Sequence, residues 1–403
     1  MTVSPEKSRA LAVDALRGLT ILVMVFVNQL AGVSGMPAWA RHMPADADAM
    51  SFVDVVFPAF LFIVGMAIPF ALGGRLARGH SPAALQAHVL ARTTGLVVLG
   101  FFMVNAESGY DERWMPWPIA AWELAFYACA LLVWAERPRA APGRLRSALR
   151  AVGVLGLLVL ADAYHGGAGG RAWMTHQWWG ILGLIGWSYL IAASAYLLAR
   201  DRPGIHLVAA AACVAFYAVG HAIDPATHPG WAALFEERAM VCETSLTFLG
   251  IVTSELFFGR HAPRLQDEAR AWRRPLVRAG ALAAAAFVAG ALLRPAYTIS
   301  KIYGSPTWSL WSAANCIVLF CALFVLVDLR GHRRIVQGLQ PLAAHPLIAY
   351  LIPFVADATL RALHLHLPAV LGAGLPGLAF SIAWAFAVLG LTALVARHLR
   401  LRL

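Results

Sequence analysis

The chain has 403 residues, of which 60% are hydrophobic and 13% are charged, and its formal net charge is +11. Soluble domains carry about 25% charged residues, so this composition excludes a soluble globular protein and indicates a polytopic helical membrane protein. A basic excess is also typical of nucleic-acid-binding proteins, but the placement of the basic residues, described below, argues against a nucleic-acid partner.

Apolar runs of about 20 residues, the length that crosses a bilayer as a helix, recur along the whole chain. They predict an all-α bundle of eleven to twelve transmembrane helices. The predicted helices cover residues 14–34, 52–73, 89–106, 117–135, 148–165, 178–199, 204–221, 239–259, 276–293, 308–329, 342–360 and 374–397. No other stretch is long enough for a second domain, so residues 1–403 are predicted to form one transmembrane domain.

Lysine and arginine are distributed unevenly between the two sides of this bundle. Seven of the 32 lie in loops that lead from an odd-numbered to an even-numbered helix: Arg41, Arg113, Arg171, Arg238, Arg294, Lys301 and Arg361. The other 25 lie on the opposite side, which also carries both ends of the chain. The positive-inside rule therefore predicts that both termini are cytoplasmic and face anionic membrane lipid.

The five cysteines all lie inside apolar runs, and none has the spacing of metal ligands. They predict buried thiols without disulfides, and no metal ion is expected. The acidic residues favour the outer half of the bundle, and several lie inside predicted helices. A carboxylate in a spanning helix costs at least ~2.5–3.5 kcal/mol on insertion scales, so it usually faces a cavity or a partner. We expect a polar outer chamber in which Glu123, Glu243 and Asp357 bind substrate.

Three polar side chains stand close together in the first two predicted helices and the loop between them. Asn28 lies eleven residues after Arg17, about 16 Å along a helix axis, and therefore in the outer part of the first helix. His42 follows in the loop, and Asp54 opens the second helix from the outer side. A carboxylate can orient an imidazole, and an amide can donate to an oxyanion. We predict an acid–base site formed by Asn28, His42 and Asp54.

The same residues also have structural interpretations. Asn28 suits an interhelical hydrogen bond, and Asp54 at a helix N-terminus suits the helix dipole. Asp14 and Arg17 are three residues apart, so they can pair on one helix face as an anchor at the membrane surface. The residues by themselves do not name a reaction.

The N-terminal part of the chain carries a specific set of motifs. ALAVDALRGLTILVMVFVNQLAG, then His42, then FVDVVFPAFLFIVGMAIP resembles the signature of the heparan-α-glucosaminide N-acetyltransferase family and its bacterial relatives. The matching positions are Asp14, Arg17, Gly18, Met24, Val27, Asn28, His42, Asp54, Phe57, Pro58, Phe60, Phe62 and Gly65. Weaker matches, such as SLTFLGIVTSELFFGR and PLAAHPLIAYLIP, follow in the family's order, so the resemblance covers most of the chain.

The resemblance implies a transmembrane acetyltransferase of the bacterial inner membrane. The donor would be cytoplasmic acetyl-CoA, and the acceptor the amine of a glucosamine-type sugar on the outer side. The catalytic histidine would be His42, with Asn28 and Asp54 beside it. The basic cytoplasmic mouth suits the CoA phosphates, so acetyl-CoA is expected to contact Arg17 and Asp14 there, and Lys301 is a further expected contact of acetyl-CoA. The resemblance leaves open whether His42 becomes acetylated or acts only as a base.

Departures from the family pattern concern the acceptor more than the fold. Asp46 and Asp48 occupy the loop where a Trp-x-Gly element is usual, and Glu123 stands where a Gln-Arg pair is expected. Three alternatives stay open: a transporter of a sugar or cell-wall precursor, an O-acyltransferase of a cell-envelope glycan, and a non-catalytic membrane subunit. The sequence does not decide between a monomer and a homodimer.

Overall fold

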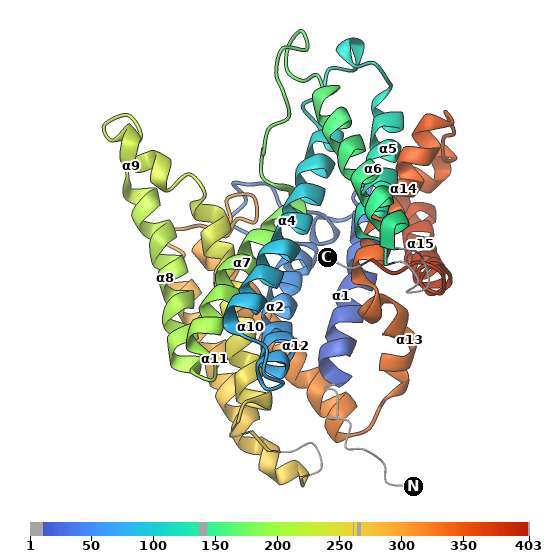
Figure 1. Ribbon diagram of the computed structural model, residues 1–403. Helices are drawn as coiled ribbons and strands as arrows, with labels where there is room; N and C mark the ends of the chain where they lie inside the picture. The colour runs from blue at the N-terminus through green and yellow to red at the C-terminus, as the bar shows by residue number, and fades with distance from the viewer. Residues whose placement is uncertain (1–10, 137–142, 261, 264–266, 402–403) are drawn as a thin grey trace, which may run out of the picture. The chain divides into compact units, whose positions relative to one another are not determined.

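The computed structural model describes residues 11–136, 143–260, 262–263 and 267–401 (Figure 1). Within these ranges every named element is helical, and the extended backbone pairs only in isolated bridges. The prediction of an all-α fold is therefore confirmed. The helices are α1 (Leu11–Leu30), α2 (Val56–Ile68), α3 (Gly74–Leu76), α4 (Pro82–Glu107), α5 (Ile119–Trp134), α6 (Gly143–Asp162), α7 (Gly180–Ala199), α8 (Pro203–Ala222), α9 (Pro229–Leu234), α10 (Arg238–Phe258), α11 (Arg273–Leu293), α12 (Pro306–Leu323), α13 (Arg334–Ala344), α14 (Pro346–Ala362) and α15 (Gly374–Val395).

The described residues contain nine helical segments that are long and apolar enough to cross a membrane, or ten if α13 and α14 count as one broken span. The chain is thus a multi-pass membrane protein. All twelve predicted ranges coincide with helices, and the difference in number comes from α5 and α6. α5 has only 16 residues, about 24 Å against a hydrocarbon core of about 30 Å. α6 has 20 residues, but its first two turns carry Arg144, Arg146 and Arg150.

The side of the membrane on which the termini lie stays a prediction. Of the basic residues that support it, six lie outside the described residues: Lys7, Arg9, Arg137, Arg139, Arg264 and Arg402. The described chain divides into two compact units. The first comprises residues 1–31, 36–89 and 188–343, and the second residues 32–35, 90–187 and 344–403. A single domain over residues 1–403 also stays a prediction.

In the first unit, α10 is the central helix and packs against α2, α8 and α12. Every residue of α10 from Cys242 to Glu255 is buried. Five of these residues are serine or threonine, and small side chains allow neighbouring backbones to approach closely. A Cβ built on Gly65 of α2 would overlap the carbonyl oxygen of Thr247 in α10. The two helices therefore meet backbone to backbone, and this contact fixes the position of the segment that precedes α2.

A buried polar contact joins α8 to α10 in the interior of the first unit. His206 Nδ1 lies 2.9 Å from Glu255 Oε2, and both side chains are almost fully buried. The imidazole stacks on Tyr196 and Phe248, with ring centroids 5.7 and 6.5 Å away. Among the described residues, neither His206 Nε2 nor Glu255 Oε1 has a further hydrogen-bond partner. The pair is therefore each residue's main polar contact.

Replacing His206 by phenylalanine is expected to destabilise the first unit, because Glu255 would keep a buried carboxyl group with no partner. The expected loss is ~1–3 kcal/mol, measured as thermal unfolding of the purified protein in detergent. The double variant His206→Phe/Glu255→Met removes both polar groups and should recover most of the loss. Single and double variants that unfold at the wild-type temperature would show that the pair does not hold α8 to α10.

In the second unit, α5 packs against α6 and α14, and α14 packs against α15. The core is aromatic: the Phe102 ring stacks on Trp122 and Phe126, with centroids 5.6 and 5.0 Å apart. The Trp122 indole N–H donates to the carbonyl of Leu160 at 2.8 Å and so ties α5 to α6. These contacts hold the short helix α5 against α6 and α14.

Candidate functional site

His42 and Asp54 form a hydrogen-bonded pair in the first unit. His42 Nδ1 lies 2.7 Å from Asp54 Oδ1, and the side chains are 37% and 1% exposed. A carboxylate oxygen accepts hydrogen bonds, so we assign the imidazole proton to Nδ1, which leaves a lone pair on Nε2. The pair therefore holds the imidazole in the tautomer that can take a proton at Nε2.

Asp54 is fixed by contacts on all sides. Its Oδ2 accepts from the backbone N–H of Ser51 at 3.0 Å and of Met43 at 3.3 Å. The loop between α1 and α2, residues 31–52, carries His42 and is called the histidine loop. The Ser51 hydroxyl donates to the carbonyl of Arg41 at 2.7 Å, which ties the residue next to His42 to the turn before α2. The buried indole N–H of Trp308 in α12 donates to the Asp54 carbonyl at 3.2 Å. Because the carboxylate is held in this way, the position of His42 is also restricted.

Lys301 is the third charged group at this site. Its Nζ lies 3.2 Å from His42 Nδ1 and 3.4 Å from His42 Nε2. Burial lowers the pKa of the Lys301 ammonium, while the negative charges of Asp54 and Glu243 oppose this shift. Sequence analysis assigned Lys301 to acetyl-CoA. That role stays a prediction; the structure places the Lys301 ammonium beside the imidazole, where it can donate to an oxygen that becomes negative.

Two aspartates attach the histidine loop to the segment that carries Lys301. Asp48 forms an ion pair with Arg294 at 3.0 Å and accepts from the backbone N–H of Ile299 at 2.8 Å. Asp46 accepts from the Tyr303 hydroxyl at 3.2 Å. These are the two residues that depart from the Trp-x-Gly element of the family pattern. Their contacts hold the loop against the segment that carries Lys301.

The Asp48 anchor should weaken in acid. The hydrogen bond from Arg294 holds the pKa of Asp48 below its usual value. A lowered carboxyl pKa stabilises the fold at pH values above the unfolded-state pKa of about 4, and this stabilisation is lost as the pH falls through the folded-state pKa.

Asp48→Asn should therefore loosen the loop at neutral pH, as acid does for the wild type. The loss of free energy that holds the loop should be less than about 1 kcal/mol, because the ion pair is partly exposed. Amide hydrogen exchange of residues 36–52 would measure this, and Arg294→Gln should give the same result. Exchange that is unchanged in Asp48→Asn would contradict it.

Glu243 of α10 lies against the turn that carries Lys301. A Cβ built on Gly304 would stand 3.2 Å from Glu243 Oε1, and the positive φ of Gly304 (+54°) also favours glycine there. Among the described residues, Glu243 Oε2 is buried without a hydrogen-bond partner. A buried carboxylate with an unsatisfied oxygen, next to the catalytic candidates, can accept from a substrate amine or hydroxyl.

Asn28 does not share the hydrogen bonds of this site. It lies near the C-terminal end of α1 with an exposed side chain, and the His42 ring contacts Asp54 and Lys301 instead. Arg17 donates to Asp14 at 3.2 Å and to the carbonyl of Ala343 at 3.4 Å. Arg17 lies on α1 eleven residues before Asn28, about 16 Å along the helix axis, and Asp14 lies three residues earlier still. Their contact with acetyl-CoA and the catalytic role of Asn28 stay predictions.

Glu123 and Asp357 lie in the second unit. Both carboxylates accept from the Arg361 guanidinium, Asp357 at 2.9 Å. The Tyr127 hydroxyl also donates to Glu123, at 3.0 Å. Within that unit the two acids are thus paired with a cation, and their part in substrate binding stays a prediction. Among the residues that the structure describes, no group of three or more potential ligands suited to a metal ion is found.

The N-terminal part of the chain, which contains His42 and Asp54, is similar to known proteins. A family model described as "Domain of unknown function (DUF5009)" matches residues 9–134, a range that includes His42 and Asp54. Heparan-alpha-glucosaminide N-acetyltransferase of Mus musculus is 34% identical over 107 residues, which cover 25% of this chain and 15% of that protein. The Homo sapiens protein of the same name is 34% identical over 98 residues, 24% of this chain and 14% of that protein. The resemblance predicted from the N-terminal motifs is confirmed, and the weaker matches in the rest of the chain stay a prediction.

The similarity is confined to part of each chain. The matched stretch spans about one seventh of the length of these relatives. The comparisons therefore show that about a quarter of this chain is similar to part of an N-acetyltransferase.

Proposed function

We propose that this protein is a membrane acetyltransferase that moves an acetyl group from acetyl-CoA to the amine of an amino sugar. The observation that carries the proposal is the His42–Asp54 pair with Lys301 beside the imidazole. The similarity to an N-acetyltransferase supports the choice of donor and acceptor. In this proposal the bundle lies in a bacterial inner membrane, with the donor on the cytoplasmic side.

The chemistry assigns one role to each side chain. Nε2 of His42 takes a proton from the acceptor ammonium, so that the neutral amine can attack the thioester carbonyl. The new C–N bond forms as the C–S bond breaks, CoA leaves as a thiolate that takes up the second proton from the acceptor nitrogen, and the imidazolium of His42 releases the first proton to water. The Asp54 carboxylate stabilises the imidazolium during this step. The Lys301 ammonium stabilises the negative charge on the carbonyl oxygen.

Glu243 gives the site its preference for an amine. Its unsatisfied Oε2 can accept from an ammonium or hydroxyl group of the acceptor. Asp46 adds a negative charge in the loop that carries His42, whereas Asp48 is paired with Arg294, and negative charge attracts an ammonium ligand. The proposal therefore favours an amine acceptor over a neutral hydroxyl acceptor.

The experiment uses the purified full chain with labelled acetyl-CoA and glucosamine. We expect release of CoA and formation of N-acetylated sugar that depend on both substrates. Liposomes that contain the protein test the transporter alternative: uptake of glucosamine without acetyl-CoA, together with no release of CoA, would overturn the proposal. Release of CoA with a hydroxyl acceptor but not with an amine would show O-acylation instead.

A further inference from the structure

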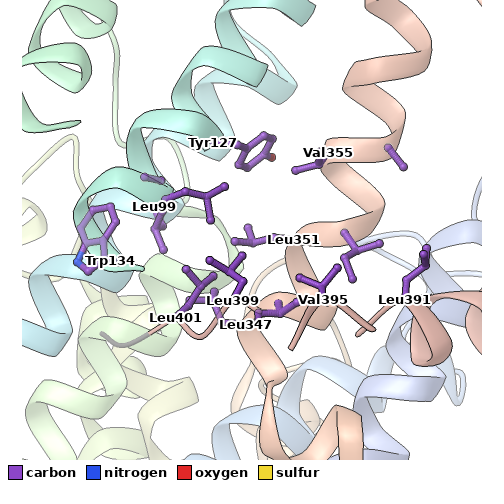
Figure 2. Close-up of a pocket in the computed structure, with 15 residues that line it drawn as sticks. Leu99, Tyr127, Trp134, Leu347, Leu351, Val355, Leu391, Val395, Leu399 and Leu401 are labelled. Atoms are coloured by element: carbon purple, nitrogen blue, oxygen red, sulfur yellow. The ribbon is translucent and has the colours of Figure 1, made fainter. Parts of the chain in front are cut away.

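A pocket of about 350 Å³ lies inside the second unit, between α4, α5, α14 and α15 (Figure 2). Its fifteen lining residues are leucine, isoleucine, valine and alanine, apart from Tyr127 and Trp134. The Tyr127 hydroxyl is already bound to Glu123 at 3.0 Å. The wall therefore offers a ligand almost only hydrocarbon.

The shape of the pocket matches one leaflet of a membrane. It begins at the end of the unit where α5 and α15 end and α14 starts, and it follows α14 from Leu347 to Ala356. Nine residues of helix correspond to about 13 Å. Half of the hydrocarbon core of a bilayer is about 15 Å. A single acyl chain that enters at this end would thus be covered for most of its depth.

The lining selects among ligands that carry long arms. A cavity of ~150 Å³ lined by Leu, Ile and Phe stays dry and takes benzene, and this pocket is more than twice as large. The arm of acetyl-CoA contains amides, and burying an amide without a hydrogen-bond partner costs roughly 2–7 kcal/mol. The pocket therefore suits a fatty acyl chain and not the arm of the acyl donor.

Basic residues lie in the C-terminal segment that lines one end of the pocket. Leu399 and Leu401 line it and lie beside Leu347 in Figure 2. The backbone N–H of Glu136 donates to the carbonyl of Arg400 at 2.7 Å, which fixes this C-terminal segment against the end of α5. The side chains of Arg397 and Arg400 are exposed. Basic residues at the end of a transmembrane helix attract anionic lipid headgroups, and here they outnumber Glu136.

We propose that this pocket binds one acyl chain of an anionic glycerophospholipid, with the lipid phosphate at Arg397 and Arg400. The apolar wall accepts the chain, the leaflet-length depth sets its orientation, and the two arginines select the headgroup. The site lies within the second unit and involves none of the residues to which we assign acetyl transfer. It therefore stands whether or not that activity is found.

The test uses the full chain reconstituted in phosphatidylcholine vesicles. Phosphatidylglycerol or phosphatidylcholine with a diazirine in one acyl chain is added at equal mole fraction. After illumination, the yield of lipid crosslinked to the peptide containing residues 347–356 is measured by mass spectrometry. We expect a yield several times higher for phosphatidylglycerol than for phosphatidylcholine.

Matched variants separate the pocket from general contact with the bilayer. Leu391→Trp fills the pocket and should lower the yield several-fold, whereas Leu394→Trp, on the same helix but outside the lining, should not. Ala356→Leu fills the inner end of the pocket and gives a second measurement should Leu391→Trp fail to fold. Arg397→Gln/Arg400→Gln should reduce the phosphatidylglycerol yield to that of phosphatidylcholine. Equal yields from both lipids, or yields that Leu391→Trp and Ala356→Leu do not change, would overturn the proposal.

Discussion

Replacing His42 by alanine is expected to lower acetyl transfer by roughly 10²–10⁴-fold, the usual contribution of a positioned general base. The reason is specific to this site: His42 is the group that Asp54 orients at 2.7 Å, and it carries the lone pair that would accept the proton. The KM for acetyl-CoA should change little, because the proposed loss is in the chemical step. The measurement is the initial rate of CoA release by the purified variant with glucosamine as acceptor.

Two controls give this result its meaning. His80→Ala changes an exposed histidine of the same unit and should leave the rate unchanged. Asp54→Asn should also lower the rate strongly, because an amide no longer stabilises the imidazolium and can favour the wrong tautomer. Thermal unfolding of His42→Ala at the wild-type temperature would exclude a folding defect. If His42→Ala kept the wild-type rate, the imidazole would have no role in transfer, and the proposed mechanism would fail.

The sequence could place His42 and Asp54 together because short-range information sufficed. They are twelve residues apart, one within the loop between α1 and α2 and one in the turn that opens α2, so the chain itself keeps them near each other. Lys301 is 259 residues from His42. Tertiary contacts, among them those of Asp46 and Asp48, bring its segment to the loop, and no local pattern encodes such a contact. For Asn28 the sequence indicates a depth along α1 but does not determine the direction of the side chain, so its role stays a prediction.

The same distinction explains the helices. Apolar length predicted where each helix lies, since a run of about 20 apolar residues has few other folds available in a membrane. It did not predict that α5 stops at 16 residues or that arginines fill the start of α6, which depend on how each helix end is solvated. The division into two units was also not predictable, because it depends on which helices pack together and not on their order.

The contact between α2 and α10 should tolerate no side chain at Gly65 or Gly250. A Cβ on Gly65 would overlap the Thr247 carbonyl, and one on Gly250 would overlap the Phe62 carbonyl. A backbone carbonyl cannot rotate away as a side chain can, so the helices would have to separate. We expect Gly65→Ala or Gly250→Ala to cost at least about 3 kcal/mol, the upper end of the usual range for overpacking.

The sign of this effect distinguishes the contact from ordinary helix propensity. Alanine is a better helix former than glycine by about 1 kcal/mol, so Gly→Ala in a helix without such a contact should stabilise it. Gly280 in α11 is exposed and has no neighbour within 4 Å of an added Cβ, and Gly280→Ala is therefore the matched control. The thermal unfolding temperature in detergent should decrease strongly for Gly65→Ala and Gly250→Ala and should not decrease for Gly280→Ala.

Because α2 follows directly on Asp54 and α10 carries Glu243, Gly65→Ala and Gly250→Ala should also lose acetyl transfer. Gly65→Ala with wild-type stability would mean that α2 and α10 are not in backbone contact, and that Asp54 is positioned by its hydrogen bonds with Ser51, Met43 and Trp308 without this contact.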